Sequence, residues 1–99
     1  MKQNKAFLKY FRTQPCSLCG VFPSDPDHII TRGAGGKDEE SNLWPLCRRH
    51  HTERHAIGLV EITRRHPHLA TILISKGFEL VQIGKDSRWK KGEGSWGGF

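Results

Sequence analysis

The sequence lacks long hydrophobic runs, a recognisable signal peptide and the even number of cysteines that a disulfide framework needs. No apolar stretch approaches the ~20 residues of a membrane-spanning helix, so we expect no membrane partner. The basic N-terminus is not followed by an apolar segment, so we expect no signal peptide. Three cysteines cannot all pair within one chain, and a C-x-x-C motif without a secretion signal indicates metal or redox chemistry in a reducing compartment. We therefore expect a cytoplasmic protein.

With 99 residues, the chain is expected to form one domain with a small core, which a bound metal would help to fold. Its 16 Lys and Arg residues outnumber its 10 Asp and Glu residues, which gives a net charge of +6. This balance favours a polyanionic partner, and nucleic acid is the commonest one. Basic surfaces also occur in small soluble domains without such a partner, so the charge alone does not identify it.

Apolar periodicity and turn residues predict an α+β fold of short elements. Helices are expected at 4–12, 47–56, 59–65 and 67–76, and strands at 27–31, 42–46 and 78–83, with a glycine-rich loop at 32–41. The single domain then has a core at about 15–58, a basic N-terminal helix within 1–14, an extension at 59–83 and a Gly/Lys/Trp-rich tail at 84–99. We expect the tail to be an arm or a disordered end.

Two pairs of metal-ligand residues have the spacing of a zinc knuckle. Cys16 and Cys19 form one pair, and Cys47 and His50 form the other. Two such pairs complete a tetrahedral site with four protein ligands, which leaves no open position and indicates a structural Zn²⁺. The alternative is that the cysteines are ordinary small buried residues and that their spacing is accidental.

A second group of potential ligands shares the same predicted helix. His51 and His55 lie at i and i+4, so both imidazoles project from one face, whereas His50 is rotated by about 100°. Asp27 on the predicted strand would add a carboxylate oxygen. Two imidazoles and a carboxylate predict an open site for Mg²⁺, Mn²⁺ or another divalent ion. Alternatively, the histidines belong to a solvated basic face.

His28 follows Asp27 and is a candidate general base, because histidine ordinarily titrates near neutral pH. It would deprotonate a water that attacks phosphorus, while the metal stabilises the leaving 3′-oxygen. Asn42 could bond to a loop backbone or to the other nitrogen of His28 and so orient it. Adjacent strand residues point to opposite sides, so a bulge or a strong twist would have to bring Asp27 and His28 to one cleft. Singly, these residues are more often polar surface or turn residues.

Together, these motifs resemble the HNH endonuclease family. The resemblance is carried by the following segments: Cys16-x-x-Cys19, Asp27-His28-Ile29, Asn42-Leu43, Leu46-Cys47-x-x-His50-His51 and His55. It implies a ββα-metal fold with His28 as general base, Asn42 as the orienting residue, and Asp27, His51 and His55 as ligands of the catalytic ion. Residues 15–20 and 46–58 resemble, more narrowly, phage-associated recombination nucleases of the Ref type.

We therefore expect a metal-dependent DNA endonuclease with weak sequence preference, acting alone, as a dimer or with a protein partner. The best candidates for phosphate contacts flank the predicted site, although each could equally belong to a solvated helix face; they are Arg32, Lys37, Arg48, Arg49 and Arg54. Trp89 and Trp96 could stack on nucleic acid or pack on the domain. The main alternative is a non-catalytic zinc-knuckle protein that binds DNA or acts as an adaptor, and a structural phage protein ranks below it.

Overall fold

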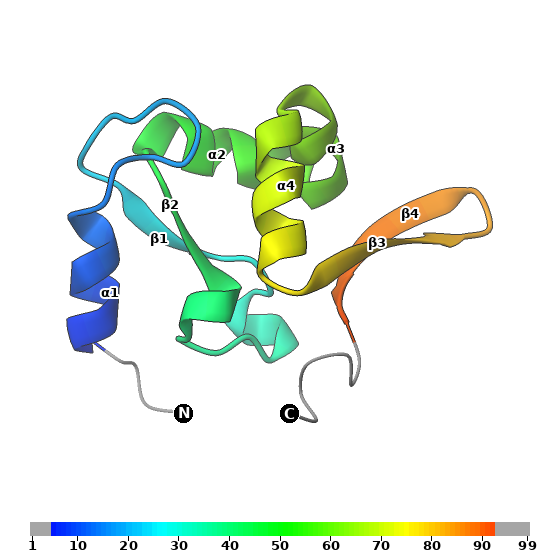
Figure 1. Cartoon of the computed structure of the whole chain (residues 1–99), viewed down its shortest axis with the longest axis horizontal. Coiled ribbons are helices and arrows are strands. Elements are labelled where there is room, and N and C mark those ends of the chain that lie inside the picture. The colour runs from blue at the N-terminus through cyan, green and yellow to red at the C-terminus, as the bar shows by residue number, and fades with distance from the viewer. Residues whose placement is uncertain (1–4, 93–99) are drawn as a thin grey trace.

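The computed structural model describes residues 5–92, which form a small α+β fold with two separate antiparallel sheets (Figure 1). Its α-helices are α1 (Lys5–Arg12), α2 (Arg48–Ile57), α3 (Leu59–Arg65) and α4 (Pro67–Ser75). Its strands are β1 (Asp25–His28), β2 (Leu43–Leu46), β3 (Phe78–Ile83) and β4 (Asp86–Lys91). The predicted loop at 32–41 contains most of two single-turn 3-10 helices, η1 (Arg32–Ala34) and η2 (Glu40–Asn42).

Strands β1 and β2 pair antiparallel, with Asp27 opposite Trp44 and His28 opposite Leu43. The predicted first strand at 27–31 was therefore placed too late, since β1 begins at Asp25 and ends at His28. The reason is that the Asn42 side chain bonds both the N–H and the carbonyl of Ile30, which replaces ladder hydrogen bonds just beyond the strand. Asn42 itself belongs to η2 rather than to β2.

Helix α2 follows β2 directly, as the sequence predicted. Cys47 is its N-cap residue, and Gly58 ends it with a positive φ of 88° that an L side chain rarely adopts. The helix has no continuous apolar face, and its buried residues are the polar His50 and Arg54. These two side chains therefore need polar partners inside the fold.

The core lies between the β1–β2 sheet and the two helices α3 and α4. Fully buried side chains include Trp44 and Leu46 from β2, Ile62 from α3, and Leu69 and Leu73 from α4. Helices α3 and α4 lie beside each other at the end of α2 (Figure 1). The extension beyond residue 58 thus contributes buried side chains that pack in the same core as those of β2.

Of the two alternatives for the predicted tail at 84–99, a disordered end is wrong for residues 86–91, which form β4 and pair along the whole of β3. Gly84 and Lys85 form a two-residue hairpin loop, and Gly84 has the positive φ (63°) that such a loop favours at its first position. Trp89 packs against the core and donates its indole N–H to Thr63. Trp96 and the rest of 93–99 lie outside the described residues.

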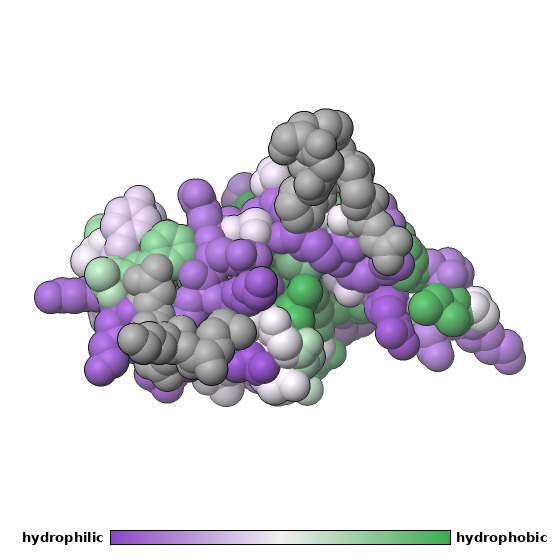
Figure 2. Space-filling model, turned by 90° about the horizontal axis from the view of Figure 1, so that it is seen from below, coloured by the Kyte–Doolittle hydropathy of each residue, from purple (hydrophilic) through white to green (hydrophobic). Residues whose placement is uncertain are grey.

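One face of the molecule is mainly polar. Figure 2 shows a face dominated by hydrophilic residues, with hydrophobic side chains gathered in a central strip and on the projecting β3–β4 hairpin. Exposed apolar residues of α4 and this hairpin include Ile74, Leu80 and Ile83. None of the helices within residues 5–92 is both long and apolar enough to cross a membrane.

Candidate functional site

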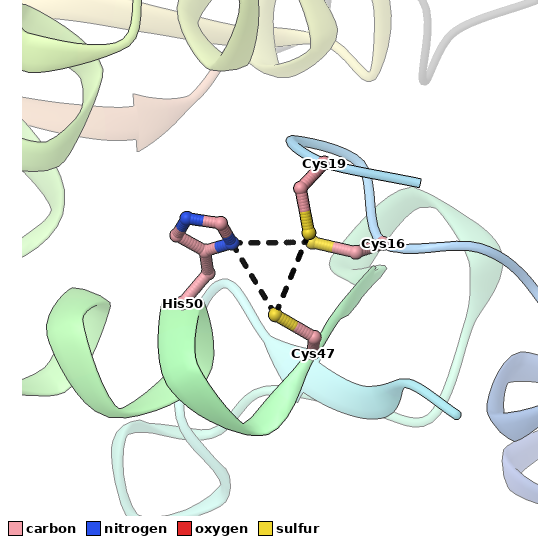
Figure 3. Close-up of side chains that lie close together, drawn as sticks. All are labelled: Cys16, Cys19, Cys47 and His50. Atoms are coloured by element: carbon pink, nitrogen blue, oxygen red, sulfur yellow. Dashed lines mark hydrogen bonds between the residues drawn. The ribbon is translucent and has the colours of Figure 1, made fainter. Parts of the chain in front are cut away.

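The two predicted knuckle pairs meet in space. Cys16 and Cys19 lie in the turn after α1, whereas Cys47 and His50 lie at the start of α2, and the four side chains converge (Figure 3). Their ligand atoms all lie within 4.8 Å of one another. The Cys16 Sγ and Cys47 Sγ atoms lie 3.6 and 3.3 Å from His50 Nδ1, and Cys19 Sγ lies 3.8 Å from Cys47 Sγ.

The three distances of 3.3, 3.6 and 3.8 Å are close to the edges of a zinc tetrahedron. With Zn–S bonds of about 2.3 Å and Zn–N bonds of about 2.0–2.1 Å, tetrahedral angles give about 3.8 Å between two sulfurs and about 3.5 Å between sulfur and nitrogen. A disulfide would need about 2.05 Å between sulfurs, and all three cysteines are free. The cluster is therefore compatible with a structural metal such as zinc.

The surroundings of the cluster shift the pKa values of Cys16 and Cys47 in opposite directions. Burial alone would raise the pKa of Cys16, but the Cys47, Cys19 and Leu18 backbone and the His50 ring lower it to about 6. Burial raises the pKa of Cys47, and the neighbouring Cys19 and Cys16 sulfurs raise it further. A cation in the cluster would favour the thiolate form of all three sulfurs.

A second cluster contains the three residues predicted to hold a divalent ion. The Asp27 Oδ1 atom lies 2.9 Å from His55 Nε2 and 3.3 Å from His51 Nε2. An ion with ligand bonds of about 2.1 Å at right angles would place neighbouring ligands about 3.0 Å apart. The structure thus brings Asp27, His51 and His55 together as one potential metal-binding group.

The second oxygen of Asp27 is occupied by protein groups. The Trp44 indole N–H donates to Asp27 Oδ2 at 2.6 Å, and Arg54 Nε lies 3.0 Å from the same oxygen. Arg54 also donates to the carbonyls of His28 and Ile29 and is buried, so its predicted phosphate contact is wrong in this structure. The physical reason is that Arg54 balances the charge of a carboxylate whose side chain is only 1% exposed.

Asp25 orients the first histidine of this cluster. Its Oδ2 atom lies 3.0 Å from His51 Nδ1, which leaves His51 Nε2 on the side of Asp27. In metal-binding histidines, the ring nitrogen that does not bind the metal commonly donates to a carboxylate, which fixes the orientation of the ring. The sequence analysis missed Asp25, although residues 25 and 27 of one strand share a face and would have indicated it.

His28 lies beside this cluster in the same surface groove. Asp27 and His28 both line the groove, together with His51, His55 and Arg48. β1 ends at His28, and the backbone and side chain of Asn42 bond the next two residues, Ile29 and Ile30. Asp27 and His28 thus both reach one groove, although they are neighbours on the strand.

Asn42 does not bond His28 in the structure. Its oxygen accepts from the Ile30 N–H, and its amide nitrogen donates to the carbonyls of Ile30 and Lys37. This is the loop-backbone alternative of the two considered for Asn42. The partner of His28 is Asp38, whose Oδ1 atom lies 2.6 Å from His28 Nε2. The sequence analysis missed Asp38, and only its position in the glycine-rich loop pointed to it.

The other predicted phosphate-binding residues lie at the surface. Lys37 and Arg49 are exposed, and Arg48 is 82% exposed beside Asp25. Arg32 lines the groove and binds Asp38. Helix α1 adds Leu8 and Arg12 to the groove wall, a contribution that was not predicted.

Residues 1–61 match the family model described as a protein of unknown function (DUF968). The match covers more than half of the chain. The chain belongs to this family. The matched residues include every member of both clusters, whereas α4 and the β3–β4 hairpin of this DUF968 protein lie beyond them.

The chain is also similar to the uncharacterized protein YdfU of Escherichia coli strain K12. The two are 40% identical over 52 residues, which are 50% of this chain and 15% of the relative. The matched segment is thus a small part of that protein. No solved structure matches the chain.

Proposed function

We propose that the chain is a metal-dependent DNA endonuclease of the HNH type that hydrolyses phosphodiester bonds. The observation that carries this proposal is the convergence of Asp27, His51 and His55 in a groove that His28 also lines. The chain order β1, β2, α2 around this cluster is what a ββα-metal arrangement requires.

The donor set of the second cluster suits a catalytic divalent ion. Trp44 and Arg54 occupy one oxygen of Asp27, so that only Oδ1 faces the histidines and would bind the ion. Three ligands leave further coordination positions for water and phosphate oxygens. Such an ion would supply positive charge to the phosphate and to the leaving oxygen.

His28 carries the proton transfer in this proposal. Its unprotonated nitrogen accepts a proton from a water molecule, and the water oxygen forms a bond to phosphorus. The bond from phosphorus to the leaving 3′-oxygen breaks, and that oxygen takes up a proton from solvent. The buried Arg54 stays out of the reaction and holds the Asp27 carboxylate in place.

The knuckle cluster would hold zinc away from the chemistry. All four of its ligands are protein atoms, which leaves no position for substrate. His50 and His51 are adjacent residues of α2 that serve the two different clusters. Zinc would therefore fix the start of α2 and, through it, the histidines of the reactive groove.

The cations around the groove suit a DNA backbone. Lys5, Lys9 and Arg12 lie at i, i+4 and i+7 of α1, so they share one helix face, and all three are exposed. Phe11, on another face, is buried against the domain. Arg12 of this helix and Arg48 of α2 both line the groove, where their positive charge would attract phosphates.

Plasmid nicking with Mg²⁺ or Mn²⁺ tests the proposal. The wild type should convert supercoiled DNA to the nicked form, and His28→Ala should lose this activity. His68→Ala is the matched control, because His68 is exposed on α4 and does not line the groove. Nicking by His28→Ala at the wild-type rate would contradict the role of His28 as general base. DNA binding without cutting with any divalent ion would favour the non-catalytic zinc-knuckle function instead.

A further inference from the structure

A carboxylate outside the proposed metal site contacts the His28 ring. The Asp38 Oδ1 atom lies 2.6 Å from His28 Nε2, a short hydrogen bond. The Asp38 side chain is only 6% exposed, although the loop that carries it lies at the surface. A carboxylate withdrawn from water in this way needs partners that fix it in one place.

Arg32 is one such partner. Its Nε and terminal N–H groups donate to Asp38 Oδ1 at 3.3 and 3.1 Å, and the terminal group also lies 3.3 Å from Oδ2. A planar guanidinium that binds both oxygens sets the orientation of the carboxylate as well as its charge. Arg32 thus holds Asp38, and Asp38 contacts His28.

We propose that Asp38 is the positioning residue of the reactive histidine and that it keeps His28 in the Nε2–H tautomer. A neutral imidazole has one protonated and one unprotonated nitrogen, and the partner of one nitrogen decides which is which. An ionised carboxylate can only accept, so Nε2 carries the proton. Nδ1 is then the nitrogen that accepts a proton from water.

The role of Nδ1 as proton acceptor rests on the proposed nuclease function. The assignment of the Nε2–H tautomer rests only on the contact with Asp38. Asn42 cannot take the role of Asp38, because its amide N–H groups bond the Ile30 and Lys37 carbonyls. A purely structural alternative is that Asp38 only stabilises the conformation of its loop through its contacts with Arg32. The two roles differ in what the replacement Asp38→Asn does to the His28 ring.

The test is nitrogen NMR of histidine-labelled protein at about pH 8, above the ordinary titration range of histidine. His28→Asn identifies the His28 signals by their loss. The wild type should show His28 protonated at Nε2. In Asp38→Asn, the amide can donate or accept, so the ring should become a mixture of both tautomers. Asp86→Asn is the control, since Asp86 is exposed on the distant hairpin.

Kinetics give the second readout. Asp38→Asn should lower kcat about 100-fold with little change in KM, because Asp38 acts through His28 and does not touch substrate. Arg32→Gln should lower kcat less and should keep the Nε2–H tautomer. An unchanged tautomer in Asp38→Asn, or an Nδ1–H ring in the wild type, would overturn the proposal. A tautomer that shifts as expected in a protein without nuclease activity would refute the function and leave the positioning role standing.

Discussion

At the scale of single residues, the two oxygens of Asp27 have different surroundings. Oδ2 contacts the Trp44 indole and the Arg54 guanidinium, whereas Oδ1 contacts the two histidines of α2. A buried carboxylate with one oxygen bonded to protein groups and one oxygen facing imidazoles could bind a cation together with those imidazoles. Arg54 therefore acts inside the protein, and its neighbours on the surface of α2 are the ones available to a ligand.

The stability of the protein should consequently respond differently to the same substitution at Arg49 and at Arg54 of α2. Arg54→Gln leaves the buried Asp27 charge partly unbalanced and should lower the free energy of unfolding by about 3 kcal/mol. Arg49→Gln removes an exposed charge and should leave this free energy nearly unchanged. Urea denaturation measures both. Equal stability of the two variants would show that Arg54 does not balance Asp27.

At the scale of elements, the glycine-rich loop packs at Gly36 against the segment that follows β1. Gly36 is buried, and a Cβ atom built on it would lie 1.7 Å from the Ile30 carbonyl oxygen and 2.8 Å from Asn42 Nδ2. The loop is therefore closed tightly against the segment that follows β1. Its conformation places Asp38 on His28.

Gly36→Ala should disturb this loop. The added methyl group would have to push the Ile30 backbone away, so we expect a loss of about 1–3 kcal/mol in the free energy of unfolding and a large loss of nicking activity. Gly33→Ala is the control, since a Cβ atom there meets nothing within 4 Å. Thermal unfolding and plasmid nicking measure the two effects. A Gly36→Ala protein that matches Gly33→Ala in both would mean that the loop is not tightly packed.

Helix α1 allows a separate prediction about DNA. Replacing Lys5 and Lys9 together by serine should reduce the salt dependence of duplex binding, by about 0.9 in the logarithmic slope for each lost phosphate contact. Replacing Lys85 and Lys90 in the hairpin makes the same change in net charge at exposed positions away from the groove. That control should alter the slope less. Fluorescence anisotropy across a salt series measures it, and equal slopes for the two double variants would contradict a specific role of α1.

At the scale of the whole molecule, the α+β composition, the helices and both ligand clusters could be predicted from the sequence. Ligands three or four residues apart on one helix or knuckle leave a local pattern, as Cys47 with His50 and His51 with His55 do. Asp38 and Trp44 could not be assigned in this way, because their contacts with His28 and Asp27 depend on how distant segments fold together.

The β3–β4 hairpin and Asp25 differ from Asp38 and Trp44, because the sequence contains local patterns that indicate them. A Gly-x pair between two alternating segments marks a two-residue hairpin loop, and Gly84 and Lys85 are such a pair. A first strand begun two residues earlier would have put Asp25 and Asp27 on one face. The misplaced start of the first strand caused the omission of Asp25, whereas the unrecognised turn at Gly84 and Lys85 caused the omission of β4.

The knuckle should govern the stability of the whole domain. We expect metal analysis to find one zinc ion per chain after purification, and removal by a strong chelator should lower the unfolding temperature markedly. Cys16→Ser should lower it in the same way, because Cys16 is buried among the other ligands. His68→Ala should not. A metal-free chain with an unchanged unfolding temperature would exclude a structural zinc.

The same knuckle has a consequence for the order in which the chain folds. Cys16 and His50 lie 34 positions apart, so a metal that joins them closes a ring of chain containing both strands of the first sheet and the loop between them. Closing such a ring lowers the conformational entropy of the chain. In a metal-bound chain this entropy is lost before the strands pair, so strand pairing itself loses less. Refolding should therefore be faster from a zinc-bound denatured chain than from a metal-free one. The time at which zinc arrives would then decide how quickly the groove is assembled.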